Sequence, residues 1–277
     1  MYKIVRKKEL NSTVTLMEIE APLVSRRARP GQFIILRVDE NGERIPLTIA
    51  DYNKEKGTIT IVFQIVGATT SLLNKKKEND YICDFVGPLG NPTNLDNLNK
   101  VLVVAGGVGS AIALPIIKEL NSNNKIVDTI AGFRNKDLVI FNDEFKKYSN
   151  KYILVSDDGS IGEKGNVTMP LDRLLKNDKS YDQVICIGPL IMMKFVSELT
   201  KKFNVKTIVS MNPIMIDGTG MCGGCRLTVD GKIKFACVDG PDFDGHLVDF
   251  DEVMSRNKTY GDFENKKREE VCKLLKG

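Results

Sequence analysis

The sequence predicts a β plus α/β chain with an N-terminal antiparallel barrel, a doubly wound parallel sheet and a small C-terminal metal-binding segment. Residues 1–96 contain short β-branched runs separated by turn signals, which is typical of a barrel. Residues 97–213 alternate apolar strands with helical stretches, which indicates a parallel sheet. Residues 214–277 hold three of the six cysteines within positions 222–237, followed by a predicted Lys-rich terminal helix over 263–276. A chain of 277 residues has room for about two domains and a small appendage.

The barrel prediction rests on runs of β-branched and partly alternating residues. These runs cover Thr13–Ile19, Phe33–Val38 and Thr58–Val66. Turn signals separate them at Arg29–Gln32 and Asp39–Gly42, and the second turn contains an Asn-Gly pair, which is a strong hairpin signal. Several strands at this spacing predict a small antiparallel barrel.

Two segments of the predicted barrel carry side chains suited to ligand binding. Arg44–Thr48 ends a loop and opens a strand, and it offers a guanidinium, a rigid proline turn and a hydroxyl. The second segment follows a strand and starts a predicted helix, where the backbone of Gly67 and the hydroxyls of Thr69 and Thr70 can hold a phosphate. The same residues suit a simple helix N-cap, and the pattern leaves both interpretations open.

The parallel sheet begins at Val101–Ala105, whose apolar composition is expected of a strand buried on both faces. Gly106-Gly107-Val108-Gly109 follows at once, and a helical stretch covers 110–121. Strand, glycine turn and helix bring backbone N–H groups to a pyrophosphate, so Gly106, Gly107 and Gly109 are predicted to bind a dinucleotide. The pattern is shorter than Gly-x-Gly-x-x-Gly, and a purely structural turn is the alternative.

Further strands are predicted over 125–134, 152–156 and 183–187, with a helix over 142–148. Ligands of doubly wound sheets bind at the carboxyl ends of the strands. Arg134, Asp157 and Gly188 fall at these ends and are therefore predicted to line the nucleotide site beside Gly106. No nucleophile or acid–base pair stands out, which suits hydride transfer.

A cysteine motif marks the C-terminal segment. Plant-type [2Fe–2S] loops read Cys-x4-Cys-x2-Cys, with a distant fourth cysteine. Here the spacing is Asp217-x4-Cys222-x2-Cys225-x11-Cys237, so a carboxylate stands where the first thiolate would be. The pattern predicts an iron–sulfur cluster with Asp217 as its fourth ligand. A structural zinc site made of the three cysteines and His246, the one histidine of the sequence, is the alternative.

Composition restricts the partners of the chain. The net charge of +4, from 40 basic and 36 acidic side chains, gives no argument for nucleic acid. The first residues lack the apolar core of a signal peptide, and the longest uncharged run, 101–117, is shorter than the ~20 residues that span a bilayer. Cysteines at metal spacing fit a reducing compartment. The expectation is a cytoplasmic protein without a membrane segment.

The order of barrel, nucleotide sheet and [2Fe–2S] loop resembles the electron-transfer subunit of dihydroorotate dehydrogenase. A closer resemblance is to the small subunit of NADH-dependent reduced ferredoxin:NADP oxidoreductase, also called sulfide dehydrogenase. The aspartate-for-cysteine loop is the specific part, because the dihydroorotate subunit resembles a four-cysteine family. The resemblance covers nearly the whole chain and rests on six segments, namely Pro46–Thr48, Gly106–Gly109, Gly132–Asp137, Asp157–Ser160, Asp217–Cys225 and Cys237–Pro241.

The resemblance implies a set of cofactors and partners. It implies FAD contacts at Pro46, Leu47, Thr48, Phe63, Gln64, Ile65, Thr69 and Thr70. It also implies NAD(P)H at the sheet, a [2Fe–2S] cluster, and a larger flavin and [4Fe–4S] subunit that bifurcates electrons between NADH, ferredoxin and NADPH, so that ferredoxin is an indirect partner. Many relatives have Arg immediately before the proline, where this chain has Ile45, and Arg44 is retained as a candidate phosphate ligand.

The predicted function is therefore electron transfer between NAD(H) and a [2Fe–2S] cluster through FAD, as the small subunit of an electron-bifurcating ferredoxin:NADP oxidoreductase. A dihydroorotate dehydrogenase-type electron-transfer subunit is the related alternative. A zinc-stabilised nucleotide-binding regulator is the alternative from a different class. A visible spectrum of protein purified without oxygen separates the electron-transfer roles from the zinc-stabilised regulator, because only an electron-transfer subunit shows flavin and iron–sulfur bands.

Overall fold

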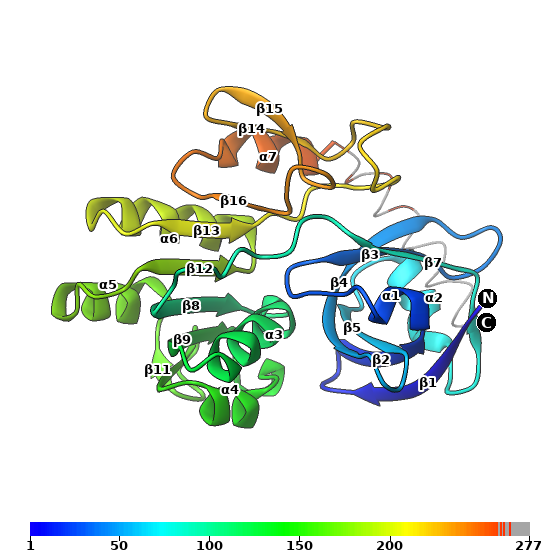
Figure 1. Cartoon of the computed structure of the whole chain (residues 1–277), viewed down its shortest axis with the longest axis horizontal. Coiled ribbons are helices and arrows are strands. Elements are labelled where there is room, and N and C mark those ends of the chain that lie inside the picture. Colours follow the sequence, from blue (N-terminus) through cyan, green and yellow to red (C-terminus); the bar gives the residue numbers. More distant parts are fainter. Residues whose placement is uncertain (260, 262, 264–265, 267–277) are drawn as a thin grey trace.

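The computed structural model describes residues 1–259, 261, 263 and 266, so most of the predicted terminal helix over 263–276 lies outside the described residues. Two seven-stranded sheets lie side by side, with a small two-stranded sheet above them (Figure 1). None of the described helices is long and apolar enough to cross a membrane.

The first sheet is a nearly closed antiparallel barrel with strand order β6-β1-β2-β5-β4-β3-β7. Alternate residues of its strands, such as Ile34, Leu36 and Phe63, point into one apolar core. The Asn-Gly turn joins β3 to β4 as predicted, and the register places Phe33 opposite Thr48 and Ile35 opposite Pro46. Its elements are β1 (Tyr2–Glu9), β2 (Val14–Glu20), α1 (Pro22–Ser25), β3 (Phe33–Arg37), β4 (Arg44–Asn53), β5 (Thr58–Gln64), α2 (Ala68–Lys75), β6 (Tyr81–Ile82) and β7 (Asp84–Leu89).

The second sheet is parallel except for its last strand, and its order is β11-β10-β9-β8-β12-β13-β16. Its elements are β8 (Lys100–Gly106), α3 (Gly109–Ser122), β9 (Ile126–Phe133), η1 (Lys136–Leu138), α4 (Asn142–Tyr148), β10 (Lys151–Ser156), β11 (Glu163–Lys164), α5 (Thr168–Asn177), β12 (Gln183–Ile187), α6 (Leu190–Lys202), β13 (Thr207–Ser210) and β16 (Asp242–Asp244). The remaining elements are β14 (Arg226–Val229), β15 (Lys232–Phe235) and α7 (Phe250–Asn257).

Helices cover both faces of the second sheet. Helices α3 and α4 pack on one face of the sheet and share a core with it. Helices α5 and α6 pack on the opposite face. The second core continues through the cysteine segment to Phe33 and Ile35 of the barrel. The sheet is therefore doubly wound, and together with the barrel and the cysteine segment it confirms the predicted fold class. β16 joins the cysteine segment to the sheet, because it pairs antiparallel with β13.

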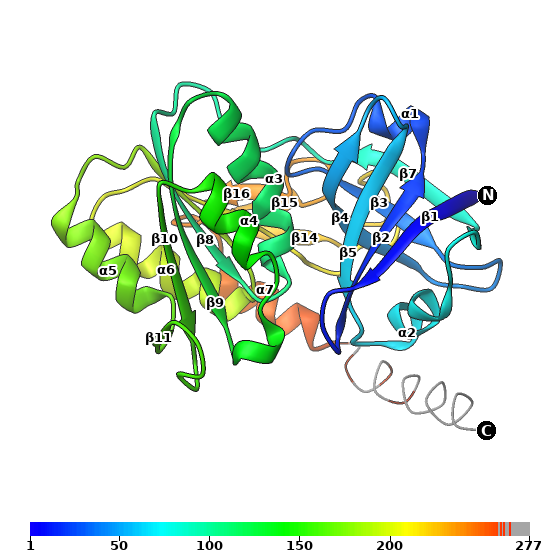
Figure 2. The ribbon, with the colours of Figure 1, turned by 90° about the horizontal axis from the view of Figure 1, so that it is seen from below.

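Helix α3 lies between the barrel and the sheet (Figure 2) and contacts β4. Lys118 of α3 forms an ion pair with Asp51 of β4 at 2.7 Å. At a second point, the side chain of Asn11 donates a hydrogen bond to the backbone carbonyl of Leu138 at 3.2 Å. These contacts connect the two sheets and leave a space between them at the carboxyl ends of the parallel strands.

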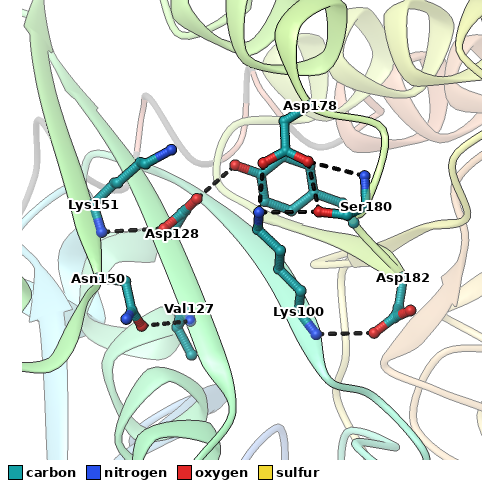
Figure 3. A network of polar contacts seen from close by, with 9 residues as sticks. Lys100, Val127, Asp128, Asn150, Lys151, Asp178, Ser180 and Asp182 are labelled. Carbon is teal, nitrogen blue, oxygen red and sulfur yellow. Dashed lines mark hydrogen bonds and ion pairs between the residues drawn. The ribbon is translucent and has the colours of Figure 1, made fainter.

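The amino ends of the parallel strands carry a network of polar contacts (Figure 3). Asp128 is buried and accepts hydrogen bonds from the Tyr181 hydroxyl at 2.6 Å and from the Lys151 backbone at 3.1 Å. Lys100 pairs with Asp178, and Asp182 accepts from the Lys100 backbone at 2.8 Å. Burial and the hydrogen bond to Asp128 raise the pKa of Tyr181, so this hydroxyl stays a donor.

Candidate functional site

A cleft of about 1340 Å³ lies between the barrel and the carboxyl edge of the parallel sheet. Parallel α/β sheets bind ligands at this edge. Nine of the residues predicted from the sequence line the cleft, although they come from two sheets, namely Pro46, Thr48, Gln64, Gly106, Gly107, Gly109, Arg134, Asp157 and Gly188. The structure thus brings the predicted barrel and nucleotide residues together in one cavity.

The barrel wall of the cleft follows the two-residue period of a strand. Pro46 and Thr48 line the cleft, whereas Leu47 between them packs against the barrel core. In the same way Gln64 lines the cleft, while Phe63 and Ile65 pack in or against the core. Contacts from Leu47, Phe63 or Ile65 to a ligand in the cleft therefore involve their backbone.

The glycine turn after β8 contains two kinds of glycine. A Cβ at Gly106 would lie 2.5 Å from Met192 Sδ, and one at Gly109 would lie 2.6 Å from the Ile187 carbonyl oxygen. Gly107 differs, because its φ is +53° and a Cβ there would meet nothing within 4 Å. Gly106 and Gly109 are thus required by packing, while Gly107 leaves the cleft open at the N-terminus of α3, where backbone N–H groups favour an anion.

Arg134 and Asp157 follow two neighbouring strands, β9 and β10, and both line the cleft. The Asp157 backbone donates to the Phe133 carbonyl at 3.0 Å, which ties the two strand ends together. Neither side chain makes a hydrogen bond or ion pair with the described residues, so both charges are available to a ligand. Because β9 lies between β8 and β10, Arg134 after β9 lies between Gly107, which follows β8, and Asp157, which follows β10.

Gly67, Thr69 and Thr70 lie at the N-terminus of α2, outside the lining of the cleft. The Thr70 hydroxyl accepts from the Gly67 backbone at 3.0 Å, and Thr69 donates to Glu43 at 3.1 Å. Thr70 therefore serves the helix N-terminus as in a capping box, whereas Thr69 bonds to a side chain just before β4, and phosphate binding there stays a prediction.

The cysteine loop places two sulfurs in the core. Cys225 and Cys237 are buried, and their Sγ atoms lie 3.2 Å apart. Burial and the neighbouring Cys225 raise the pKa of the Cys237 thiol, although the Gly220 backbone faces its sulfur. Cys222 is exposed. Backbone N–H groups, of which that of Gly224 has the largest effect, lower the pKa of its thiol. Cys222 and Cys225 thus belong to the loop 216–225, and Cys237 lies next to it, facing the Gly220 backbone.

Asp217 opens this loop. Its Oδ2 accepts hydrogen bonds from the backbone of Thr219 at 3.0 Å and of Met221 at 3.2 Å, and from the Thr219 hydroxyl. These bonds, and the nearby Arg44, lower the pKa of the carboxyl, so it stays ionised. Arg44 therefore lies toward the cysteine loop and outside the lining of the cleft.

The four predicted ligands fit a two-iron cluster better than a single metal ion. No group of three or more His, Cys, Asp or Glu side chains within the described residues stands at metal-binding distances. His246 contacts the Thr200 hydroxyl at 3.0 Å, so it does not complete a zinc site with the cysteines. Cys225 and Cys237 form one pair with sulfurs 3.2 Å apart, and the backbone N–H of Asp217 faces the Cys222 sulfur, so these two residues are also neighbours. Two pairs of ligands suit a cluster in which each iron takes two.

The cysteine loop packs directly on the barrel. Gly218 has a φ of +81°, and a Cβ there would lie 2.9 Å from Ile35 Cγ1 and 2.8 Å from Leu89 Cδ1. Ile35 stands two residues after Phe33, which lines the cleft. Because residues two apart share one face of a strand, the cleft and the cysteine loop lie next to each other along the outer face of β3.

Several residues that line the cleft were not predicted from the sequence. They come from loops, helices and the start of β3, where no motif marks them, among them Asn11, Phe33, Met169, Ile191, Phe195 and Met211. Met169, Ile191 and Phe195 are large apolar side chains that stay exposed. Their exposure depends on helix packing, so no sequence signal could have identified them.

Comparison with known proteins agrees with this geometry. Residues 212–249 match the iron–sulfur cluster binding domain of dihydroorotate dehydrogenase B. The chain is 53% identical to the "uncharacterized protein in adh 3'region" of Clostridium beijerinckii, over 98% of this chain and 94% of that one. It is 50% identical to the dihydroorotate dehydrogenase B (NAD(+)) electron transfer subunit homolog of Thermotoga maritima, over 93% and 91%. The structure of an NADH-dependent reduced ferredoxin-NADP oxidoreductase superposes with a TM-score of 0.92 at 47% identity, covering 98% of both chains.

Fold and site define an oxidoreductase subunit of the ferredoxin-reductase-like class, with an iron–sulfur domain near its C-terminus. The chain belongs to the family of the dihydroorotate dehydrogenase B electron transfer subunit and its homologues. This membership confirms the predicted electron-transfer role, and at the level of the family it confirms the cofactor set of FAD, NAD(P)H and an iron–sulfur cluster. It also removes the support for a zinc-stabilised regulator.

Proposed function

We propose that this chain passes electrons between NADH and a [2Fe–2S] cluster through FAD, as the small subunit of a ferredoxin:NADP oxidoreductase. The observation that carries the proposal is the position of β3, whose Phe33 lines the cleft while Ile35 touches the cysteine loop at Gly218. A flavin bound against the barrel wall is then close to both the sheet and the cluster loop. FAD supplies the exchange between the paired electrons of nicotinamide and the single electrons of a cluster.

The barrel wall is the proposed flavin site. Pro46, Thr48 and Gln64 line the cleft and offer side chains to it. Phe33 adds an apolar surface from β3. Arg44 lies near Asp217, so we assign it to the electrostatics of the cysteine loop and give it no role as a flavin phosphate ligand.

The sheet wall is the proposed dinucleotide site. The open Gly107 position at the N-terminus of α3 takes the pyrophosphate, and Arg134 on the next strand adds a positive charge. The nicotinamide then faces the barrel, and the adenosine extends toward β10, where Asp157 is located. An acidic residue suits a ribose 2′-hydroxyl and repels a 2′-phosphate, so the proposed substrate is NADH rather than NADPH.

The proposed cluster ligands form two pairs. Asp217 and Cys222 bind one iron, and Cys225 and Cys237 bind the other. The ionised carboxylate of Asp217 supplies a hard oxygen donor to the first iron. The backbone N–H groups that face Cys222 and Cys237 stabilise thiolates, and hydrogen bonds to sulfur are among the factors that set cluster potentials.

The proposed partner is a larger flavin and [4Fe–4S] subunit that reaches ferredoxin and carries out bifurcation. Homologues of this chain are named as electron transfer subunits, which implies a second subunit. Met221 and Ile216 of the cysteine loop are 88% and 54% exposed, and Val238 beside Gly220 is 45% exposed. Exposed apolar side chains of this kind fit a subunit interface. Thiolate ligands of this kind suit the reducing cytoplasm, where we place the complex.

The test is purification without oxygen, followed by titration with NADH. The expected result is a flavin spectrum with an iron–sulfur shoulder, bleaching of the flavin by NADH and an EPR signal of the reduced cluster. Bleaching by NADPH alone would contradict the assignment of the dinucleotide. If the co-purified complex reduces NAD(+) with dihydroorotate, the related dihydroorotate dehydrogenase role replaces the proposed one.

A further inference from the structure

The linker between the barrel and the parallel sheet, residues 90–99, contacts the last strand of that sheet, β16, and the two residues in contact are 149 positions apart. The Thr93 hydroxyl in the linker donates to Asp242 Oδ2 at 2.6 Å. The other carboxyl oxygen, Oδ1, is shielded from solvent and has no hydrogen-bond partner among the described residues. Buried polar oxygens normally have a donor, so this group needs an explanation beyond packing.

On the barrel side, Thr93 is held against the turn that precedes β3. Its backbone donates to the Pro30 carbonyl at 2.9 Å. Its hydroxyl lies so close to Gly31 that a Cβ at Gly31 would stand 2.2 Å away. β3 begins two residues later with Phe33, which lines the cleft. A shift of Thr93 would therefore be transmitted to the barrel wall.

On the sheet side, Asp242 is part of the opposite wall. It pairs with Ser210 of β13, and the Met211 backbone donates to the Pro241 carbonyl at 2.9 Å. Ser210, Met211 and Pro241 all line the cleft. The hydrogen bond between Thr93 and Asp242 thus connects the two walls.

The surroundings of this carboxyl are uncharged. It faces the hydroxyl of Thr93 from the linker and that of Ser210 from β13, and no charged side chain contributes to its pKa. Burial raises the pKa of Asp242 to about 6, and the two hydroxyls lower it only in part. The neutral carboxyl keeps an acceptor for Thr93 without burying a charge, whereas ionisation places an unpaired charge in the junction.

We propose that Asp242 is a positioning residue whose contact with Thr93 sets the distance between the barrel wall and the sheet wall. This inference rests on the proposed function, because that distance matters for hydride transfer only if the cleft holds FAD and NADH together. The junction loosens as Asp242 ionises, so hydride transfer slows as the pH rises through about 6.

The experiment measures anaerobic flavin reduction by NADH in a stopped-flow instrument between pH 5.5 and 8. Asp242→Ala and Thr93→Val should each lower the limiting rate by about tenfold or more, because small misplacements of reacting groups can cost up to ~100-fold. The NADH dissociation constant should change little. Asp242→Asn keeps an acceptor for Thr93, so it should match the wild type at pH 5.5 and lose the decline above pH 6.

Asp244→Asn is the matched control, because this next carboxylate of β16 caps the His246 backbone and should leave the rate profile unchanged. Unchanged limiting rates in both Asp242→Ala and Thr93→Val would overturn the inference, as would a loss in Asp242→Asn equal to that in Asp242→Ala. If Asp242→Ala does not fold, the nearly isosteric Thr93→Val decides. Wild-type flavin that NADH fails to reduce would instead overturn the proposed function.

Discussion

The two edges of the parallel sheet are built from the same strands and have opposite chemistry. At the amino edge, Asp128 is buried with two donors, and Lys100 pairs with Asp178 (Figure 3). At the carboxyl edge, Arg134 and Asp157 face a cleft, and their side chains have no partner among the described residues. Polar groups that satisfy one another stabilise a fold, whereas polar groups left without partners in a cavity are available to a ligand.

This difference makes a prediction about substitutions. Changes at the amino edge should lower stability and leave electron transfer intact. Changes at the carboxyl edge and in the cysteine loop that follows it should remove electron transfer and leave most of the stability. The variants below test this division, beginning with the largest expected effect.

Cys237→Ser should remove the cluster. It withdraws one of two buried sulfurs that lie 3.2 Å apart and replaces a soft ligand by a hydroxyl. Iron content and the EPR signal should fall to background while NADH still bleaches the flavin. Cys83→Ser is the control, because this half-buried cysteine lies in the barrel, outside the loop. Equal iron loss in both variants would indicate general misfolding.

Gly107→Val should lower the rate of flavin reduction by NADH about a hundredfold, because a side chain there blocks close approach of the pyrophosphate. The positive φ also strains the variant by roughly 1–2 kcal/mol. Gly231→Val isolates that strain, since Gly231 has a φ of +68° and equally open surroundings in the β14–β15 turn. Both variants should lose similar stability, and a similar loss of rate in both would remove Gly107 from the site.

Tyr181→Phe should lower the free energy of unfolding by about 1.5–3 kcal/mol, the range for a hydrogen bond to a charged group. Asp128 loses its donor at 2.6 Å, while the ring under Lys100 is kept. Chemical denaturation measures the loss. Flavin reduction by NADH should stay within about twofold of the wild type, and a large change in that rate would break the division between the two edges.

Asp157→Asn should raise the ratio of NADPH to NADH turnover by roughly tenfold, which corresponds to ~1.4 kcal/mol of repulsion removed. Initial rates with both dinucleotides measure this ratio. Asp158→Asn is a useful comparison, because Asp158 accepts hydrogen bonds from Ser160 within its own loop and should leave the ratio nearly unchanged. A wild-type ratio in Asp157→Asn would place the adenosine elsewhere.

Asp217→Cys should have the smallest effect on cluster content. It restores four thiolates, so the cluster is kept, but its midpoint potential and EPR signal shift with the change of ligand. Asp217→Ala should make the cluster labile. If both variants keep the potential, EPR signal and cluster lifetime of the wild type, Asp217 only caps its loop through Thr219 and Met221.

Much of this protein could be predicted from local patterns. The structure contains the apolar strand Val101–Ala105, the glycine turn after it and the helix that follows the turn. The bounds of the strand and the helix agree with the prediction within one or two residues. The Asn-Gly hairpin and the position of Cys225 beside Cys237 also follow from local pattern and spacing. Each of these features depends on residues close together in the chain, where backbone preference and hydrophobic period act directly.

Other features depend on contacts between distant segments, and only the tertiary structure decided them. β16 joins the parallel sheet, Arg44 turns toward Asp217, and Thr93 meets Asp242 across 149 positions. Side chains alternate along β4, but only the closed barrel decides that Pro46 and Thr48 face the cleft and Leu47 faces the core. The sequence by itself determined which chemistry is present, because motifs are local. The fold decided which of those groups meet, because burial and pairing are set by the whole packed chain.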